Sequence, residues 1–229
     1  ETAGKQADQK AKEQAPQNEW PHVLLHEEFV DGNYDRNPGW TVASGTFWVD
    51  SNSFLRTEQR VPASSQRGQN SEAKPQDLFG QVVKDILLPK QESAGSDRSE
   101  IFTPLQIGKA FALKVDLQVL SDQPGQSFEL GLYQSQDRST GYTLRYVLQQ
   151  DQSLALIRTS RSGSSVIDAV KGKKLLRKGR HQSLTVYRHA DGRMKVVTGE
   201  DEILSTRDTM LESFNGFTFV NRGGDYAIS

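Results

Sequence analysis

Apolar residues alternate with other residues through the second half of the sequence, and this pattern constrains the fold more than any other feature. It is clearest at residues 111–119, where apolar side chains occupy every second position: Phe111, Leu113, Val115, Leu117 and Val119. Lys114, Asp116 and Gln118 lie between them. Because successive side chains of a β-strand point to opposite faces, the pattern predicts a strand with one face in a core and the other in water.

The same character recurs to the end of the chain. Strand-like segments occur at residues 128–132, 142–148, 154–157, 166–167, 184–187, 194–197, 203–204, 214–220 and 226–228. Polar turns separate them, and the Asp191-Gly192 step is a strong signal for a hairpin. A series of about a dozen short strands joined by polar turns predicts an all-β fold, an antiparallel β-sandwich.

The segment 22–58 contributes further predicted strands. Residues 22–29 are expected to form the first strand, and residues 31–39 form a loop because they are dense in Asp, Asn, Gly and Pro. Short strands are then predicted at 40–42, 46–49 and 54–55.

Two polar segments interrupt the strand pattern. The first, residues 1–20, is predicted to be a flexible tether, because residues 1–19 have only Ala as an apolar side chain. The second is an insertion at residues 59–98. Within it, apolar residues recur at helical spacing between Pro75 and Pro89, which predicts one short helix. Residues 21–229 are expected to form a single domain around this insertion.

Composition excludes several classes of function. The chain of 229 residues has no Cys, so disulfides, thiolate metal sites and a Cys nucleophile are excluded. Its 28 basic and 29 acidic residues give a formal net charge of −1, which gives no reason to expect nucleic acid as a partner. The basic stretch 171–180 is interpreted as a solvated loop, with a patch for anionic polymers as the alternative.

The order of several motifs resembles a known family. The motifs are His26-Glu-Glu-Phe29, Trp40-Thr-Val42, Gly45-Thr-Phe-Trp-Val-Asp50, Gly141-Tyr-Thr-Leu144, Lys178-Gly-Arg-His-Gln-Ser-Leu-Thr-Val186, the pair 193–197 and 203–204, and Gly224-Asp-Tyr-Ala-Ile228. Together they resemble the concanavalin A-like lectin/glucanase family, in its laminin-G-like, bacterial type. The resemblance implies a jelly roll in which the last strand pairs with the first.

A structural calcium ion is one expectation from this resemblance. Such jelly rolls often hold calcium where the first and last strands meet, and calcium prefers oxygen ligands. Glu27, Glu28, Asp31 and Asp225 are the candidate ligands. The alternative is that these carboxylates are ordinary surface groups and that Asx turns hold the loop.

Aromatic residues provide the candidates for a sugar-binding site. Tyr34 lies in a predicted loop, and Tyr133 is out of phase with its apolar neighbours, so it is expected on the outer face of its strand. These two residues are the predicted ligand-binding residues. Tyr142 and Tyr146 are in phase with the core, and Trp40 and Trp48 are expected in the core as well.

A catalytic role finds less support in the residues. The glucanases of this family carry Glu-x-Asp-x-x-Glu on one strand, and the sequence has no such motif. The acidic cluster 200–202 falls where a hairpin turn is expected. The prediction is therefore a non-catalytic binding or adhesion module outside the cytoplasm that recognises a glycan or a protein. Two alternatives stay open: a structural or sensory ectodomain with a membrane tether, and a hydrolase of keto-disaccharide or glucanase type.

Overall fold

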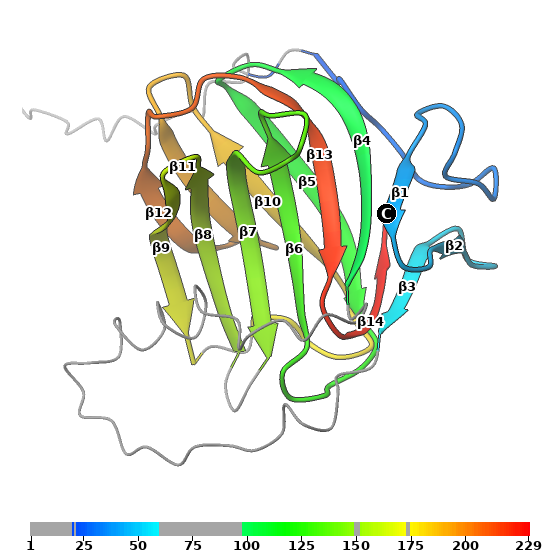
Figure 1. Cartoon of the computed structure of the whole chain (residues 1–229). Coiled ribbons are helices and arrows are strands. Elements are labelled where there is room, and N and C mark those ends of the chain that lie inside the picture. The colour runs from blue at the N-terminus through cyan, green and yellow to red at the C-terminus, as the bar shows by residue number, and fades with distance from the viewer. Residues whose placement is uncertain (1–19, 21, 60–97, 149–151, 173–174) are drawn as a thin grey trace, which may run out of the picture.

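The structure, a computed structural model, describes Trp20 and residues 22–59, 98–148, 152–172 and 175–229. This part of the chain is all-β and forms two antiparallel sheets of seven strands each, with no helix (Figure 1). The predicted antiparallel sandwich is confirmed. The predicted helix and most of the predicted tether and insertion lie outside the described residues.

The front sheet, nearer to the viewer in Figure 1, and the back sheet are named here for that view. The front sheet runs in the order β1 (Thr41–Ser44), β4 (Ser99–Ile107), β13 (Phe214–Asn221), β6 (Ser127–Tyr133), β7 (Gly141–Leu148), β8 (Gln152–Ser160) and β9 (Gly163–Lys171). The back sheet runs in the order β12 (Asp201–Arg207), β11 (Arg193–Thr198), β10 (His181–Arg188), β5 (Phe111–Val119), β14 (Gly224–Ile228), β3 (Leu55–Gln59) and β2 (Trp48–Val49).

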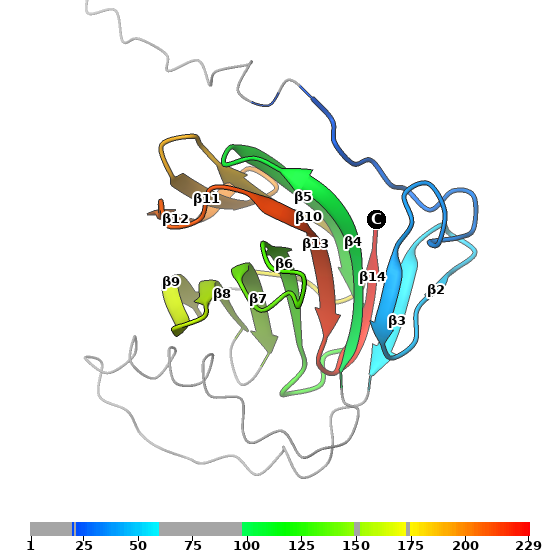
Figure 2. The ribbon, with the colours of Figure 1, turned by 45° about the horizontal axis from the view of Figure 1, so that its top comes forward.

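The core lies between the two layers, which Figure 2 shows separated. The front sheet contributes Phe128, Leu130 and Leu132 from β6, and the back sheet contributes the alternating apolar residues of β5. Because each strand turns every second side chain inward, the same alternation leaves the remaining side chains on the two outer faces. The outer face of the front sheet carries the candidate site.

The prediction of a first strand at residues 22–29 is wrong. No strand is present there, and Val23 is 82% exposed. The segment is attached mainly through Phe29, which is buried in the core. The last strand, β14, therefore pairs with β3 and β5 instead of with residues 22–29.

The two tryptophans of this region have different environments. Trp40 is buried, as predicted, but Trp48 is 39% exposed, so the prediction of a core position for Trp48 is wrong. The reason is that β2 is the edge strand of the back sheet, where the ring lies 5.8 Å from the guanidinium carbon of Arg56.

Among the described residues, no helix is long and apolar enough to cross a membrane.

Candidate functional site

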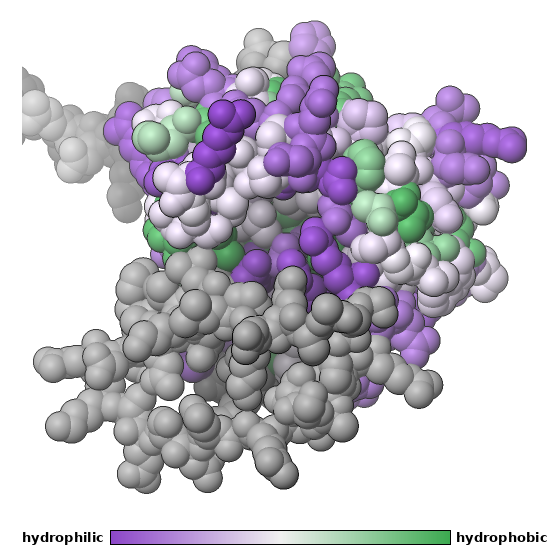
Figure 3. Space-filling model, in the orientation of Figure 1, coloured by the Kyte–Doolittle hydropathy of each residue, from purple (hydrophilic) through white to green (hydrophobic). Residues whose placement is uncertain are grey.

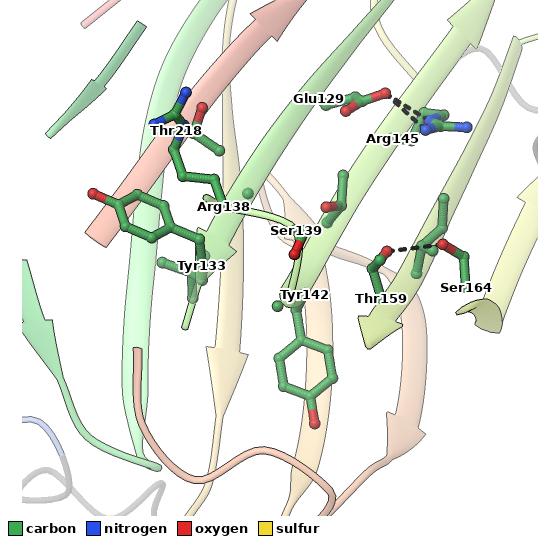
Figure 4. A pocket seen from close by; sticks show the side chains of 14 residues that line it. Glu129, Tyr133, Arg138, Ser139, Tyr142, Arg145, Thr159, Ser164 and Thr218 are labelled. Carbon is green, nitrogen blue, oxygen red and sulfur yellow. Dashed lines mark hydrogen bonds and ion pairs between the residues drawn. The ribbon is translucent and has the colours of Figure 1, made fainter. Parts of the chain in front are cut away.

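A hollow of about 300 Å³ lies on the outer face of the front sheet. Strand register builds its floor from one row of paired residues across four strands: Thr218, Gly131, Thr143 and Ile157. Figure 3 shows hydrophilic side chains gathered around the hollowed centre of this face. Figure 4 shows the lining residues from close by.

The hollow exists because Gly131 has no side chain. A Cβ atom at Gly131 would lie 2.7 Å from Cγ2 of Thr218, closer than real Cβ contacts allow. Tyr133 occupies the next outward position on β6, and its phenol lies over Gly216 and donates a hydrogen bond to the carbonyl oxygen of Thr103 at 3.3 Å. Gly131 is therefore required for the floor of the hollow, and Gly216 is required because the ring of Tyr133 packs directly over it.

Glu129 is a buried carboxylate at one side of the hollow. Its Oε1 atom accepts from Nη2 of Arg145 at 2.8 Å and from Nε of Arg222 at 2.9 Å. Burial raises the pKa of Glu129, but the positive charges of Arg145 and Arg222 outweigh it and hold the pKa below the ordinary value. Glu129 is thus a fixed anion between two guanidinium groups.

Glu100 on β4 forms a similar cluster two strands away from Glu129, and it reaches the hollow through its partner Arg138. Its Oε1 atom accepts from Nε of Arg138 at 2.8 Å, and its Oε2 atom pairs with Nη2 of Arg98 at 2.7 Å. The guanidinium carbon of Arg138 lies 4.1 Å from the ring centroid of Phe102, within the range of a cation–π contact. This arrangement fixes the position of Arg138 at the edge of the hollow.

The two carboxylates are separated by one strand. Val220 on β13 pairs with Glu100 on one side and with Glu129 on the other. Because neighbouring strands lie roughly 4.8 Å apart, the Cα atoms of the two glutamates are about 10 Å apart. Glycosidases also place two carboxylates on one face, but one of them needs a raised pKa to act as the acid. The lowered pKa of Glu129 does not suit that role.

An apolar patch borders the polar hollow. Ala155 and Ile157 on β8 pack with Val166 and Ala169 on β9, in a cluster separate from the main core. Hydroxyl groups of Thr143, Thr159 and Ser164 lie nearby in the lining. The site therefore offers charged hydrogen-bond donors, fixed acceptors and hydroxyl groups within one hollow, and the buried side chain of Ile157 lies at its base.

The two predicted ligand-binding residues are in different places. Tyr133 lies on the outer face of β6, as its phase predicts, and lines the hollow, although its ring is buried and its pKa is raised by that burial. Tyr34 is half-buried and packs against the main core, away from the residues that line the hollow. A role for either in ligand binding stays a prediction.

The four predicted calcium ligands are held by other partners. Oε1 of Glu27 accepts from the backbone N–H of Phe29 at 2.6 Å, and Glu28 lies 3.5 Å from His26. Oδ1 of Asp31 accepts from the backbone of residue 33, and Asp225 pairs with the guanidinium of residue 56.

No group of three or more His, Asp or Glu side chains that could hold a metal ion occurs within the described ranges. The four carboxylates are thus not brought together as a metal site there, and calcium binding stays a prediction.

The sequence reasoning missed the charged residues of the hollow. Glu129 lies between Phe128 and Leu130, and Arg145 lies between Leu144 and Tyr146. The register pairs Glu129 directly with Arg145. A pair of opposite charges at outward positions of adjacent strands was therefore a signal in the sequence, but it becomes readable only once the two strands are known to be neighbours.

Comparison with known proteins identifies the fold. No known protein family and no curated protein matches the sequence. In structure, the chain is similar to the carbohydrate binding module CBM66 from Bacillus subtilis, with a TM-score of 0.57 and 12% identity over 85% of this chain and 94% of that one. The fold is a lectin- or glucanase-like sandwich.

This sandwich is also similar to a glycoside hydrolase family protein from Mycobacterium thermorestibile. The TM-score is 0.52, with 11% identity over 90% of this chain and 98% of that one. At identities this low the likeness concerns the fold alone, so the function has to be argued from the site.

Proposed function

We propose that this chain binds a glycan in the hollow on the outer face of the front sheet, as a non-catalytic module outside the cytoplasm. The observation that carries the proposal is the hollow itself, which is lined by the buried Glu129, by its partner Arg145 and by Arg138, an arginine held in place by a second buried carboxylate, Glu100. The fold likeness to a protein named as a carbohydrate binding module supports it.

The chemistry of the lining suits a ligand with many hydroxyl groups. Carboxylates accept hydrogen bonds from hydroxyls and guanidinium groups donate to them, and such charge-assisted bonds are roughly twice as strong as neutral ones. The ion pairs already hold Arg138 and Arg145 in place, so little side-chain ordering accompanies binding.

The size of the hollow favours a glycan over a protein partner. Its volume is about 300 Å³, at the small end of the roughly 300–1,000 Å³ of small-molecule sites. A stable protein interface instead covers about 800 Å² per partner, usually without a central hollow of this kind. The lowered pKa of Glu129 supports binding without catalysis, because a glycosidase acid must hold its proton at neutral pH.

A matched pair of substitutions tests this proposal. Thr143→Phe would fill the hollow, whereas Thr185→Phe places the same ring on the outer face of the back sheet, where Thr185 is also half-buried in an inner strand. On a glycan array, we expect Thr143→Phe to weaken binding by about tenfold or more, a loss of roughly 1.4 kcal/mol. We expect Thr185→Phe to bind like the parent.

Two results would oppose the proposal. Equal losses in both variants, with folding intact by circular dichroism, would remove the hollow as the site. Release of reducing sugar from a bound glycan would show that the module is an enzyme.

A further inference from the structure

A second hollow, of about 550 Å³, lies at one end of the sandwich. We refer to it as the end hollow. The β6–β7 loop, the β8–β9 turn and the segment after β12 surround it. Its lining combines the apolar Met210 and Leu211 with Gln134 and with hydroxyl and guanidinium groups: Ser135, Thr140, Arg158, Ser160, Arg161 and Ser162. Such a lining is rich in hydrogen-bond donors.

The β8–β9 turn brings many of these groups together. Residues 159–165 read Thr-Ser-Arg-Ser-Gly-Ser-Ser, and Ser160 pairs with Gly163, which leaves Arg161 and Ser162 at the tip. Gly163 has a φ of 122°, a conformation that other residues rarely adopt. Within the turn, Oγ of Ser160 lies 2.8 Å from Oγ of Ser162. The sequence therefore places one arginine among closely spaced hydroxyl groups.

The two arginines of the end hollow differ in their partners. Arg158 donates to Oδ2 of Asp208, and Oδ1 of Asp208 accepts from the hydroxyl of Tyr142 at 2.6 Å. Burial, reinforced by the hydrogen bond to Asp208, raises the pKa of Tyr142 to about 12, so that hydroxyl stays a donor at neutral pH. Arg158 thus forms a neutralised, fixed wall of the hollow.

Arg161 is exposed, and no residue of the described ranges forms an ion pair or a hydrogen bond with its side chain. Its charge is therefore available to a ligand. A guanidinium binds carboxylate, sulfate or phosphate oxygens through two parallel hydrogen bonds, a geometry that ammonium and hydroxyl groups do not match.

The end hollow adjoins the front hollow. Ser139 and Thr159 line the front hollow, and the residues that follow them, Thr140 and Ser160, line the end hollow. Consecutive Cα atoms are about 3.8 Å apart, so only the edge of the sheet separates the two hollows. An oligosaccharide that occupies the front hollow can pass over this edge with its next sugar.

We propose that the end hollow binds the anionic group, a carboxylate or a sulfate, of an acidic saccharide whose neighbouring sugar occupies the front hollow. The identity of the saccharide rests on the proposed function, but the anion site does not. Arg161 makes the bidentate contact. The hydroxyl of Ser160 donates within the turn, and the hydroxyl of Ser162 donates its proton to a remaining oxygen atom of the anion.

The anion site is tested without knowing the glycan. The full chain is titrated with sodium sulfate, sodium glucuronate and glucose at constant ionic strength, while backbone amide shifts are recorded by NMR. Arg161→Gln is compared with Arg180→Gln, which removes the same charge from an exposed position near the start of β10, at the opposite end of the sandwich.

We expect sulfate and glucuronate to shift the amides of residues 160–163 in the parent and in Arg180→Gln, with binding about tenfold weaker or more in Arg161→Gln. Glucose should leave these amides unchanged. Equal binding by both variants, or shifts spread over all basic residues, would overturn the anion site. A response to only one of the two anions would identify which chemistry the site takes.

A glycan array then separates this inference from the proposed function. If acidic glycans bind more tightly than their neutral counterparts and Arg161→Gln removes the difference, the inference is supported. If neutral and acidic glycans bind equally in both proteins, the inference fails and the proposed function stands. If no glycan binds while the sulfate titration succeeds, the proposed function fails and the anion site stands.

Discussion

The two outer faces of the sandwich differ in how deeply they bury charged and aromatic side chains. On the front face, the side chain of Glu129 is only 10% exposed and the ring of Tyr133 is buried. On the back face, the side chain of Asp225 is 25% exposed and the ring of Trp48 lies open. Trp20 also belongs to the back face, where its ring packs 5.2 Å from that of Tyr187.

The burial of carboxylates on the front face has an energetic cost. Removing a carboxylate from water costs several kcal/mol unless partners compensate, and the front face supplies two guanidinium groups to each buried glutamate. Replacing such a buried ion cluster by apolar residues would often stabilise a protein. These two clusters on the front face are the reason why the proposed glycan site is assigned to it, whereas the back face has the ordinary pattern of a solvated sheet.

The largest predicted effect compares the two faces through one substitution on each. Glu129→Gln keeps the shape but leaves Arg145 and Arg222 without their shared carboxylate, so we expect a loss of about 3–5 kcal/mol in the free energy of unfolding. Asp225→Asn on the back face breaks the more exposed pair with Arg56 and should cost about 1 kcal/mol. Urea denaturation of both variants measures the difference, and equal losses would contradict the proposed contrast.

The pH dependence of the same variant gives a second test. The pKa of Glu129 is lowered below its ordinary value of 4.5 in the folded protein, so the unfolded chain binds more protons as the pH falls. The stability from Glu129 is therefore fully present above pH 4.5 and is lost as the pH falls through the folded-state pKa. The difference in the free energy of unfolding between the parent and Glu129→Gln should therefore become smaller as the pH is lowered. A difference that stayed constant down to pH 3 would argue against an ionised Glu129.

The sequence predicted the sandwich because strand alternation is a local signal. Phe128, Leu130 and Leu132 reveal their inward face without knowledge of any other strand. Residues 22–29 misled the prediction, because an apolar stretch forms a strand only when a neighbouring strand offers its backbone groups, and here none pairs with it. Trp48 was misplaced for a related reason: its exposure depends on β2 being an edge strand, which is a property of the whole sheet.

The site was less predictable because it depends on pairing between distant strands. Glu100 and Thr218 meet at 3.4 Å although more than a hundred residues separate them in the chain. The phase of Tyr133 did predict its outward position, since that depends only on its own strand. The arginines that pair with Glu100 and Glu129, and the floor at Gly131, could not be predicted without knowing the register of β4, β13, β6 and β7.

A smaller effect is expected from Trp20 on the back face. Its ring lies 5.2 Å from Tyr187 and 5.3 Å from His189, and aromatic pairs contribute about 0.5–1.5 kcal/mol beyond area burial. We expect Trp20→Ala to lower the free energy of unfolding by about 1 kcal/mol and to leave glycan binding unchanged, because the front hollow lies on the opposite face. A midpoint of urea denaturation equal to the parent's would show that the packing of Trp20 contributes nothing.

The sharpest test of which face binds comes from Trp48, on the edge strand of the back sheet. Exposed aromatic rings are common sugar platforms, so the open ring of Trp48 is the main rival to the front hollow. Trp48→Ala removes the cation–π contact with Arg56, worth about 0.5–1 kcal/mol, together with the packing of the covered part of the ring. If this variant keeps full glycan binding while Thr143→Phe loses it, the front face is the binding face. If the losses are reversed, the buried ion clusters are structural and the glycan site belongs to the back sheet.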